Sequence, residues 1–268
     1  MKKIALILLD ALTRESAVHT FGFLRSLVES GEAGYLEVTG DLPSLSRPCY
    51  ESILTGTPSS VHHITANNMS VPSPVPSVFS LAHDAGLKTG AAAYHWISEL
   101  YNRSPFNPFE DRITHDEQQN IQHGIFYFDD TYPDSHLFLD GAALCSRYVP
   151  DFMLFHPMGI DYVGHAYGSQ SREYEKKCVE MDTILANAVP LLVSQGYGVI
   201  VTSDHGMSAL GNHGGDQSMM RDVFAYFIHC GIPQEAAPVS QLCLAPTICT
   251  LLDILPAPTM KKPPICLD

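Results

Sequence analysis

The chain has 268 residues, of which 45% are hydrophobic and 16% charged, and its formal net charge is −14. This length and composition fit a globular domain with a sizeable core, and the acidic excess argues against a nucleic-acid partner. Seven cysteines are scattered without a Cys-x-x-Cys pair. We therefore expect buried free thiols in a reducing cytoplasm.

The first apolar segment imitates a secretory signal. Met1-Lys2-Lys3 is followed by the run Ile4–Leu9, which ends at Asp10. A signal peptide needs roughly 7–15 apolar residues and a small-residue cleavage site, so we expect this shorter run to be a buried strand. No later segment approaches the ~20 apolar residues of a membrane helix.

Predicted strands and helices alternate along the rest of the chain. Apolar runs predict strands at residues 35–39, 89–93, 152–156, 198–202 and 223–228. Helical spacing and stop signals predict helices at residues 20–30, 48–55, 78–85, 171–194 and 245–252. This alternation favours a single α/β domain with a mostly parallel, doubly wound sheet. Residues of about 101–134, rich in Pro, Asn, Asp and aromatics, interrupt it, and we expect a small cap inserted there over the sheet's edge.

Carboxylates and imidazoles follow three of the predicted strands. They stand at the carboxyl ends, where open α/β sheets place their ligands. Aspartate and histidine together suit zinc or a similar divalent ion. The side chains concerned are Asp10, Asp161, His165, Asp204, His205 and His213.

Each of these signals has a simpler alternative when taken alone. Asp10 after its strand could be a helix N-cap. Asp161 and His165 are four residues apart and share one face of a helical turn, but such pairs also occur as surface contacts. Asp-His-Gly, which begins at Asp204, is a common turn sequence. The combination of all three segments is what predicts a metal site.

A serine precedes the predicted helix that starts at Pro48. Ser46 would lie at a helix N-terminus, where free backbone N–H groups favour an anion such as phosphate. A nearby metal ion would lower its pKa and make it a nucleophile. Helix capping by Ser46, and Ser44 as the nucleophile, are the open alternatives.

Together these residues divide into two metal sites. Asp161, His165 and His213 would hold one ion. The other would be held by Asp10, Asp204, His205 and the Ser46 oxygen. Two cations roughly 4 Å apart clamp the attacking and leaving oxygens of a phosphoryl displacement. Zinc is favoured, with manganese or iron as alternatives.

With these motifs the chain resembles the alkaline phosphatase superfamily, and within it the nucleotide pyrophosphatase/phosphodiesterase branch. Pro-Ser-Leu-Ser-Arg-Pro at residues 43–48 is similar to the family's Pro-x-x-Thr-x-Pro, which places the nucleophile at Ser46. The segments 159–165 and 203–207 match the metal motifs, and Ala-Pro-Thr at 245–247 resembles a C-terminal helix of the family. The resemblance implies a three-layer α/β/α sandwich. It also implies that Asn67 binds a phosphoryl oxygen, with Asn68 as the less favoured choice.

The resemblance extends to ethanolamine-phosphate transferases, whose catalytic domains carry a similar short segment between the last two histidines. Here His213 follows His205 by only eight positions, whereas larger phosphodiesterases have a long insertion that bears part of the substrate pocket. A nucleotide-specific pocket is therefore in doubt. The sulfatase nucleophile pattern is absent, and the chain is too short for the inserted domain of the cofactor-independent phosphoglycerate mutases.

We expect a two-zinc hydrolase of small phosphate esters, most of all phosphodiesters, that works through a phosphoseryl intermediate. Asn67 and the backbone N–H of Arg47 would stabilise charge on the non-bridging oxygens. The Arg47 side chain either binds phosphate or faces solvent. The alternative functions are a phosphotransferase, a phosphonate hydrolase with the same site, and a metal-binding descendant without activity. The sequence predicts no oligomeric state.

Overall fold

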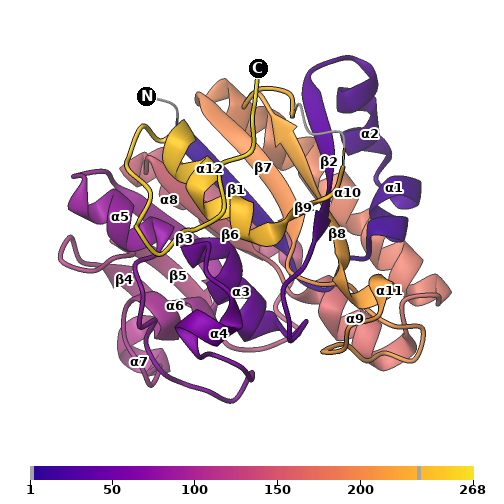
Figure 1. Ribbon diagram of the computed structural model, residues 1–268, viewed down its shortest axis with the longest axis horizontal. Helices are drawn as coiled ribbons and strands as arrows, with labels where there is room; N and C mark the ends of the chain where they lie inside the picture. Colours follow the sequence, from indigo (N-terminus) through magenta and orange to yellow (C-terminus); the bar gives the residue numbers. More distant parts are fainter. Residues whose placement is uncertain (1–2, 234–236) are drawn as a thin grey trace.

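The computed structural model describes residues 3–233 and 237–268. Its single sheet has nine strands in the order β4-β5-β3-β6-β1-β7-β8-β2-β9 (Figure 1). The strands are β1 (Lys3–Leu9), β2 (Ala33–Thr39), β3 (Thr89–Tyr94), β4 (Ile113–His115), β5 (His123–Tyr127), β6 (Phe152–His156), β7 (Tyr197–Ser203), β8 (Asp222–Ile228) and β9 (Val239–Ser240).

Twelve α-helices and one 3-10 turn, η1 (Gln241–Cys243), occur among the described residues. The helices are α1 (Arg14–Thr20), α2 (Gly22–Glu29), α3 (Ser46–Thr55), α4 (Ser59–His62), α5 (Val78–Asp84), α6 (His95–Tyr101), α7 (Pro108–Asp111), α8 (Asp134–Tyr148), α9 (Gly159–Tyr167), α10 (Arg172–Ser194), α11 (Ser218–Arg221) and α12 (Leu244–Leu251). No described helix has the length and hydropathy needed to cross a membrane.

The sheet separates two hydrophobic cores, which makes the three-layer sandwich that the sequence predicted. Along β1 the side chains alternate: Ile4, Leu6 and Leu8 enter one core with α3, α5, α6 and α12. Ala5, Ile7 and Leu9 enter the other core with α1, α2, α8 and α10. Because β1 is buried on both faces, it reads as a continuous apolar run.

The central strands are parallel and the flanks are mixed. β5, β3, β6, β1 and β7 run in one direction. β8 is antiparallel to both β7 and β2, and β4 is antiparallel to β5. The α/β class with a mostly parallel sheet is thus confirmed.

The segment expected to form a cap, about residues 101–134, contributes α7, β4 and β5. Both strands belong to the sheet, because β5 pairs in parallel with β3 and β4 pairs with β5. The segment therefore widens the sheet at its edge. Helix α8, which begins at Asp134, was not predicted from the sequence.

The helix predicted for residues 20–30 is α2, which begins at Gly22, and the short helix α1 before it was not predicted. α1 ends at Thr20, and Phe21 lies between the two helices in a non-helical conformation. Phe21 is fully buried, and the backbone N–H of Phe23 donates to the Asp182 carboxylate at 2.9 Å. A core contact and a carboxylate from α10 therefore fix the start of α2, two residues later than predicted.

Candidate active site

The predicted ligands meet at the carboxyl ends of the three central strands. In the pairing of β1 with β7, Leu9 lies opposite Ser203, so Asp10 and Asp204 emerge side by side. β6, on the other side of β1, leads into α9, which carries Asp161 and His165. The strand register thus brings together residues that are far apart in the chain.

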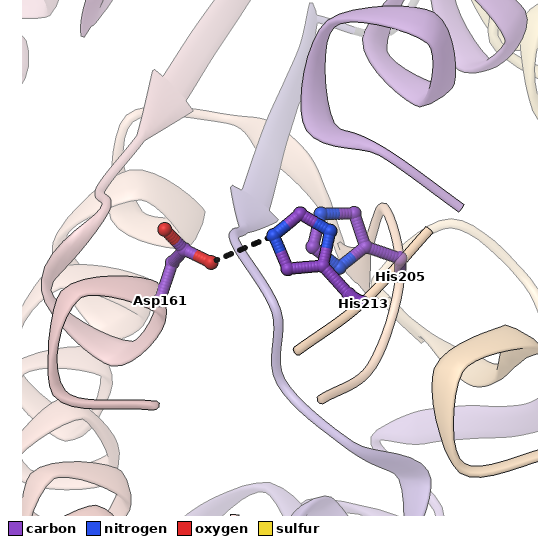
Figure 2. Close-up of side chains that lie close together, drawn as sticks. All are labelled: Asp161, His205 and His213. Atoms are coloured by element: carbon purple, nitrogen blue, oxygen red, sulfur yellow. Dashed lines mark ion pairs between the residues drawn. The ribbon is translucent and has the colours of Figure 1, made fainter. Parts of the chain in front are cut away.

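Asp161, His165 and His213 form one group of ligand atoms. The Nε2 atoms of His165 and His213 are 3.1 Å apart. Asp161 Oδ1 lies 3.4 Å from His165 Nε2 and 3.6 Å from His213 Nε2. Figure 2 shows Asp161 facing His213, with the His205 ring stacked behind.

Asp10, Asp204 and His205 form the second group, and all three are fully buried. His205 Nε2 lies 3.2 Å from Asp204 Oδ2 and 3.5 Å from Asp10 Oδ1. His205 also comes within 4.8 Å of Asp161 and His213 by their ligand atoms. His205 therefore lies between the two groups, whereas the sequence predicted it as a ligand of the second group only.

The three histidines all present the same nitrogen to the centre. The Nδ1 atoms of His165, His205 and His213 each face a backbone carbonyl, at 2.8, 2.9 and 3.0 Å. A carbonyl only accepts, so Nδ1 carries the proton and the Nε2 lone pair points inward. This second contact is the usual way in which a protein orients a metal-binding imidazole.

The carboxylates are arranged in a similar way. Asp204 Oδ1 accepts the backbone N–H groups of Ala11 and His205, at 3.1 and 2.8 Å. Asp204 Oδ2, Asp10 Oδ1 and Asp161 Oδ1 are buried and have no hydrogen-bond partner in the structure. Buried carboxylate oxygens without partners are costly, and together with three inward lone pairs they fit divalent cations.

The electrostatics agree with this fit. Burial and the neighbouring Asp10 raise the pKa of both Asp161 and Asp204 well above the ordinary value. Burial and the charge of His213 lower the pKa of His205 to about 3. The protein alone thus disfavours the charged forms of Asp161 and Asp204, and bound cations would reverse that preference.

Ser46 is the first residue of α3 and faces the second group. Its Oγ lies 3.1 Å from His205 Nε2. The N-cap is Leu45, and it makes no side-chain cap, so Ser46 does not serve as the capping residue. The Ser44 hydroxyl instead donates to the backbone carbonyl of Gly215. Of the two serines, only Ser46 has its hydroxyl among the ligand atoms.

Asn67 lies beside the start of α3. Its Oδ1 accepts the backbone N–H of Arg47 at 3.0 Å, which leaves the amide N–H₂ group for another acceptor. The two groups proposed to contact the non-bridging oxygens are thus neighbours. Their role in substrate binding stays a prediction.

The Arg47 side chain does not face solvent, so that alternative is wrong. Arg47 is 1% exposed, and its guanidinium pairs with Glu99 at 2.6 Å and donates to the Met69 carbonyl at 3.0 Å. It also lies 4.7 Å from the centre of the Trp96 ring. Because these partners occupy the guanidinium, a direct contact with phosphate stays a prediction.

Two further contacts support the site, and neither was predicted from the sequence. The Tyr50 hydroxyl donates to Asp10 Oδ2; Tyr50 follows Ser46 by four residues, and this helical spacing was a readable signal. Asp134 accepts the backbone N–H of Gly159 at the start of α9 and pairs with Lys177 at 2.8 Å. No pattern in the sequence links the Asp134 segment to the metal motif.

Comparison with known proteins identifies the family of this chain. A family model described as "Type I phosphodiesterase / nucleotide pyrophosphatase" matches residues 75–222, more than half of the chain. The chain belongs to this family, and it is a member of the alkaline phosphatase superfamily, as the motifs predicted.

The curated relatives are GPI ethanolamine phosphate transferases. Enzyme 2 of this name from Candida albicans is 25% identical over 94% of this chain. The catalytic subunit of enzyme 3 from Homo sapiens is 32% identical over 40% of the chain. The chain covers only 30% of the Candida protein and 10% of the human one.

Solved structures share the fold. Murine ectonucleotide pyrophosphatase/phosphodiesterase 5 has a TM-score of 0.75 at 14% identity, with 96% of each chain covered. Phosphonoacetate hydrolase from Sinorhizobium meliloti has a TM-score of 0.57 at 23% identity, covering 76% of this chain and 57% of the hydrolase. At these identities the likeness concerns the fold alone.

Proposed function

We propose that this protein cleaves a small phosphodiester with Ser46 as nucleophile and transfers the phospho group to an acceptor hydroxyl. The observation that carries the proposal is the position of Ser46 Oγ, 3.1 Å from His205 Nε2 and next to the free carboxylate oxygens. The names of the curated relatives, ethanolamine phosphate transferases, support an alcohol as acceptor.

The donor set suits two divalent ions, with zinc favoured by its mixture of nitrogen and oxygen. Asp161, His165 and His213 would hold one ion. Asp10, Asp204, His205 and the Ser46 oxygen would hold the other. Such ions, when bound, lower the pKa of a serine hydroxyl and balance charge on the attacking and leaving oxygens.

The residues of the chain position the reacting groups. Ser46 starts α3, so the positive end of that helix's dipole would favour a bound phosphate beside it. The Asn67 amide N–H₂ would hold a non-bridging oxygen, and the Arg47 N–H, which donates to Asn67 Oδ1, would orient that amide. Asp10, Asp204 and His205 are fully buried, so the electrostatic contacts of these three residues act away from bulk water, where they are stronger.

Two displacements at phosphorus complete the reaction. Ser46 Oγ forms a bond to phosphorus as the bond to the leaving alcohol breaks, and the serine proton ends on the departing oxygen. The acceptor oxygen then displaces Ser46 Oγ from phosphorus, and the acceptor's proton returns to the serine. Phosphorus keeps its valence throughout, and the enzyme is restored.

Hydrolysis is the second candidate, since the family model is described as a phosphodiesterase. Water would replace the acceptor alcohol in the second displacement. The His165 side chain is 49% exposed, so the first ligand group opens to solvent and either acceptor can approach from that side.

One experiment tests the chemistry and the acceptor together. Zinc-loaded protein is given bis-p-nitrophenyl phosphate with and without glycerol as an acceptor alcohol, and both p-nitrophenol and the fate of the phosphate are followed. A new phosphodiester of glycerol supports transfer, and p-nitrophenyl phosphate alone supports hydrolysis. Ser46→Ala should lose about 10³-fold or more in rate, while Ser44→Ala, the matched control, should retain activity. Equal rates for the wild type and Ser46→Ala would exclude Ser46 as nucleophile.

A further inference from the structure

The two oxygens of the Asp10 carboxylate have different surroundings. Oδ2 accepts the Tyr50 hydroxyl and lies 3.4 Å from His156 Nε2. Oδ1 has no hydrogen-bond partner and lies 3.5 Å from His205 Nε2. One oxygen is therefore held by the Tyr50 hydroxyl, with His156 Nε2 beside it but outside hydrogen-bond geometry, and the other faces the second ligand group.

Asp204 shows the same division with different partners. Its Oδ1 is held by the backbone N–H groups of Ala11 and His205, and its Oδ2 is free. A backbone donor cannot be removed by substitution, but a side-chain donor can. Asp10 is consequently the ligand whose orientation depends on other side chains.

Packing fixes both side chains that contact Asp10 Oδ2. Tyr50 and His156 are fully buried, and their rings meet edge to face, with centroids 4.5 Å apart. Phenols keep their proton at neutral pH, so the Tyr50 hydroxyl donates to the carboxylate. The backbone N–H of Tyr94 faces His156 Nδ1 at 3.4 Å, which places the imidazole proton on Nε2, toward Asp10.

We propose that Tyr50 and His156 are positioning residues that turn Asp10 Oδ1 toward a metal ion, so that the Tyr50 hydroxyl sets the affinity of one half of the site only. That half contains Asp10, Asp204 and His205. The other half, with Asp161, His165 and His213, does not depend on it. The inference rests on the metal binding proposed above.

Tyr50 also lies on the helix that begins with Ser46, four residues earlier. One turn of α3 therefore carries the nucleophile and the group that orients a ligand beside it. A purely structural role for Tyr50 would need its ring but not its hydroxyl. Tyr50→Phe keeps the ring and removes the donor, so it separates the two roles.

The test is a zinc titration against a competing chelator, read as the affinity of each bound ion. The wild type should bind two zinc ions. Tyr50→Phe should weaken one of them by about 10-fold or more, the usual effect of removing a group that orients a metal ligand, and leave the other unchanged. In a His165→Ala background, which impairs the first half, the loss due to Tyr50→Phe should persist.

Tyr197→Phe is the matched control. Tyr197 is also a buried tyrosine (2% exposed), at the start of β7, and its hydroxyl donates to the Pro150 carbonyl at 2.7 Å. This variant should bind both ions as the wild type does. Tyr50→Phe with two unchanged affinities, or with both weakened equally, overturns the inference and leaves the proposed metal centre standing. A wild type that binds no metal overturns both.

Discussion

Glu51 gives a prediction whose size follows from its surroundings. It is a fully buried residue of α3, the helix that begins with Ser46, and the hydroxyls of Ser73 and Tyr101 donate to its two oxygens. Burial raises the pKa of this carboxyl from 4.5 to about 7, although both hydrogen bonds work in the opposite direction. We expect Glu51→Gln, which has the same shape without the charge, to remove a pH-dependent cost.

The direction of this pH effect on the free energy of unfolding follows from the coupling of protonation to folding. Because the folded pKa lies above the unfolded one, protonated Glu51 contributes stability fully below pH 4.5, and this contribution is lost as the pH rises through about 7. At about 1.4 kcal/mol per pKa unit, the total is roughly 3 kcal/mol. About 2.5 kcal/mol of it falls between about pH 5 and about pH 8.

Denaturant unfolding of the wild type and Glu51→Gln at these two pH values measures the difference. Every other titrating group is common to both proteins, so subtracting the two pH dependences isolates Glu51. The wild type should lose about 2.5 kcal/mol more than the variant on going to the higher pH. Parallel pH dependences would show that Glu51 is ionised in the folded protein at no cost, and would refute this reasoning.

Three other changes test how the site is held. A Cβ on Gly168, which has φ +82°, would lie 2.0 Å from the Ala209 carbonyl oxygen, so Gly168→Ala should destabilise by about 2 kcal/mol or more and weaken zinc binding. Gly86 has a similar φ of +76°, but a Cβ added to it would have no atom within 4 Å. Gly86→Ala should therefore cost only about 1 kcal/mol of unfolding free energy and leave zinc affinity unchanged. Equal losses of stability in the two variants would contradict the steric argument. Asp134→Asn should cost roughly 2 kcal/mol in denaturant unfolding, because it removes the carboxylate 2.8 Å from the largely buried Lys177 ammonium and leaves only Glu180, at 3.8 Å. An unchanged midpoint would exclude the pair as a support of α9. Chelation of bound metal should lower the thermal midpoint and abolish turnover, since a ligand bound only by the folded state stabilises it; a midpoint insensitive to chelator would argue against a metal centre.

The local content of the site was readable from the sequence. An apolar run that ends in a carboxylate is a buried strand with its polar group at the carboxyl end, and this placed Asp10 and Asp204. The four-residue spacing of Asp161 and His165 predicted the shared helical face seen in α9. These signals depend on strand and helix periodicity, which neighbouring residues set by themselves.

Contacts between distant segments required the tertiary structure. The register of β1 against β7 puts Asp10 beside Asp204, and no local pattern specifies that register. The residues alone left Ser44 and Ser46 open and only the family resemblance favoured Ser46; the structure adds that the Ser46 hydroxyl faces the His205 ring and the Ser44 hydroxyl faces the Gly215 carbonyl. The sequence placed the Arg47 side chain either at a phosphate or in solvent, but in the structure it forms a buried ion pair with Glu99 on α6.

The strands at the edge of the sheet could not be predicted from local sequence either. Residues 101–134 have no strong alternation, and β4 and β5 form there because β3 offers an unpaired edge with free backbone donors and acceptors. Tyr50 and Asp134 act on the site across packed interfaces. The sequence by itself determined which side chains could take part in the chemistry, because that depends on residue type and local spacing. The tertiary structure alone decided which of these side chains meet, because strand pairing and core packing bring together segments that are far apart in the chain.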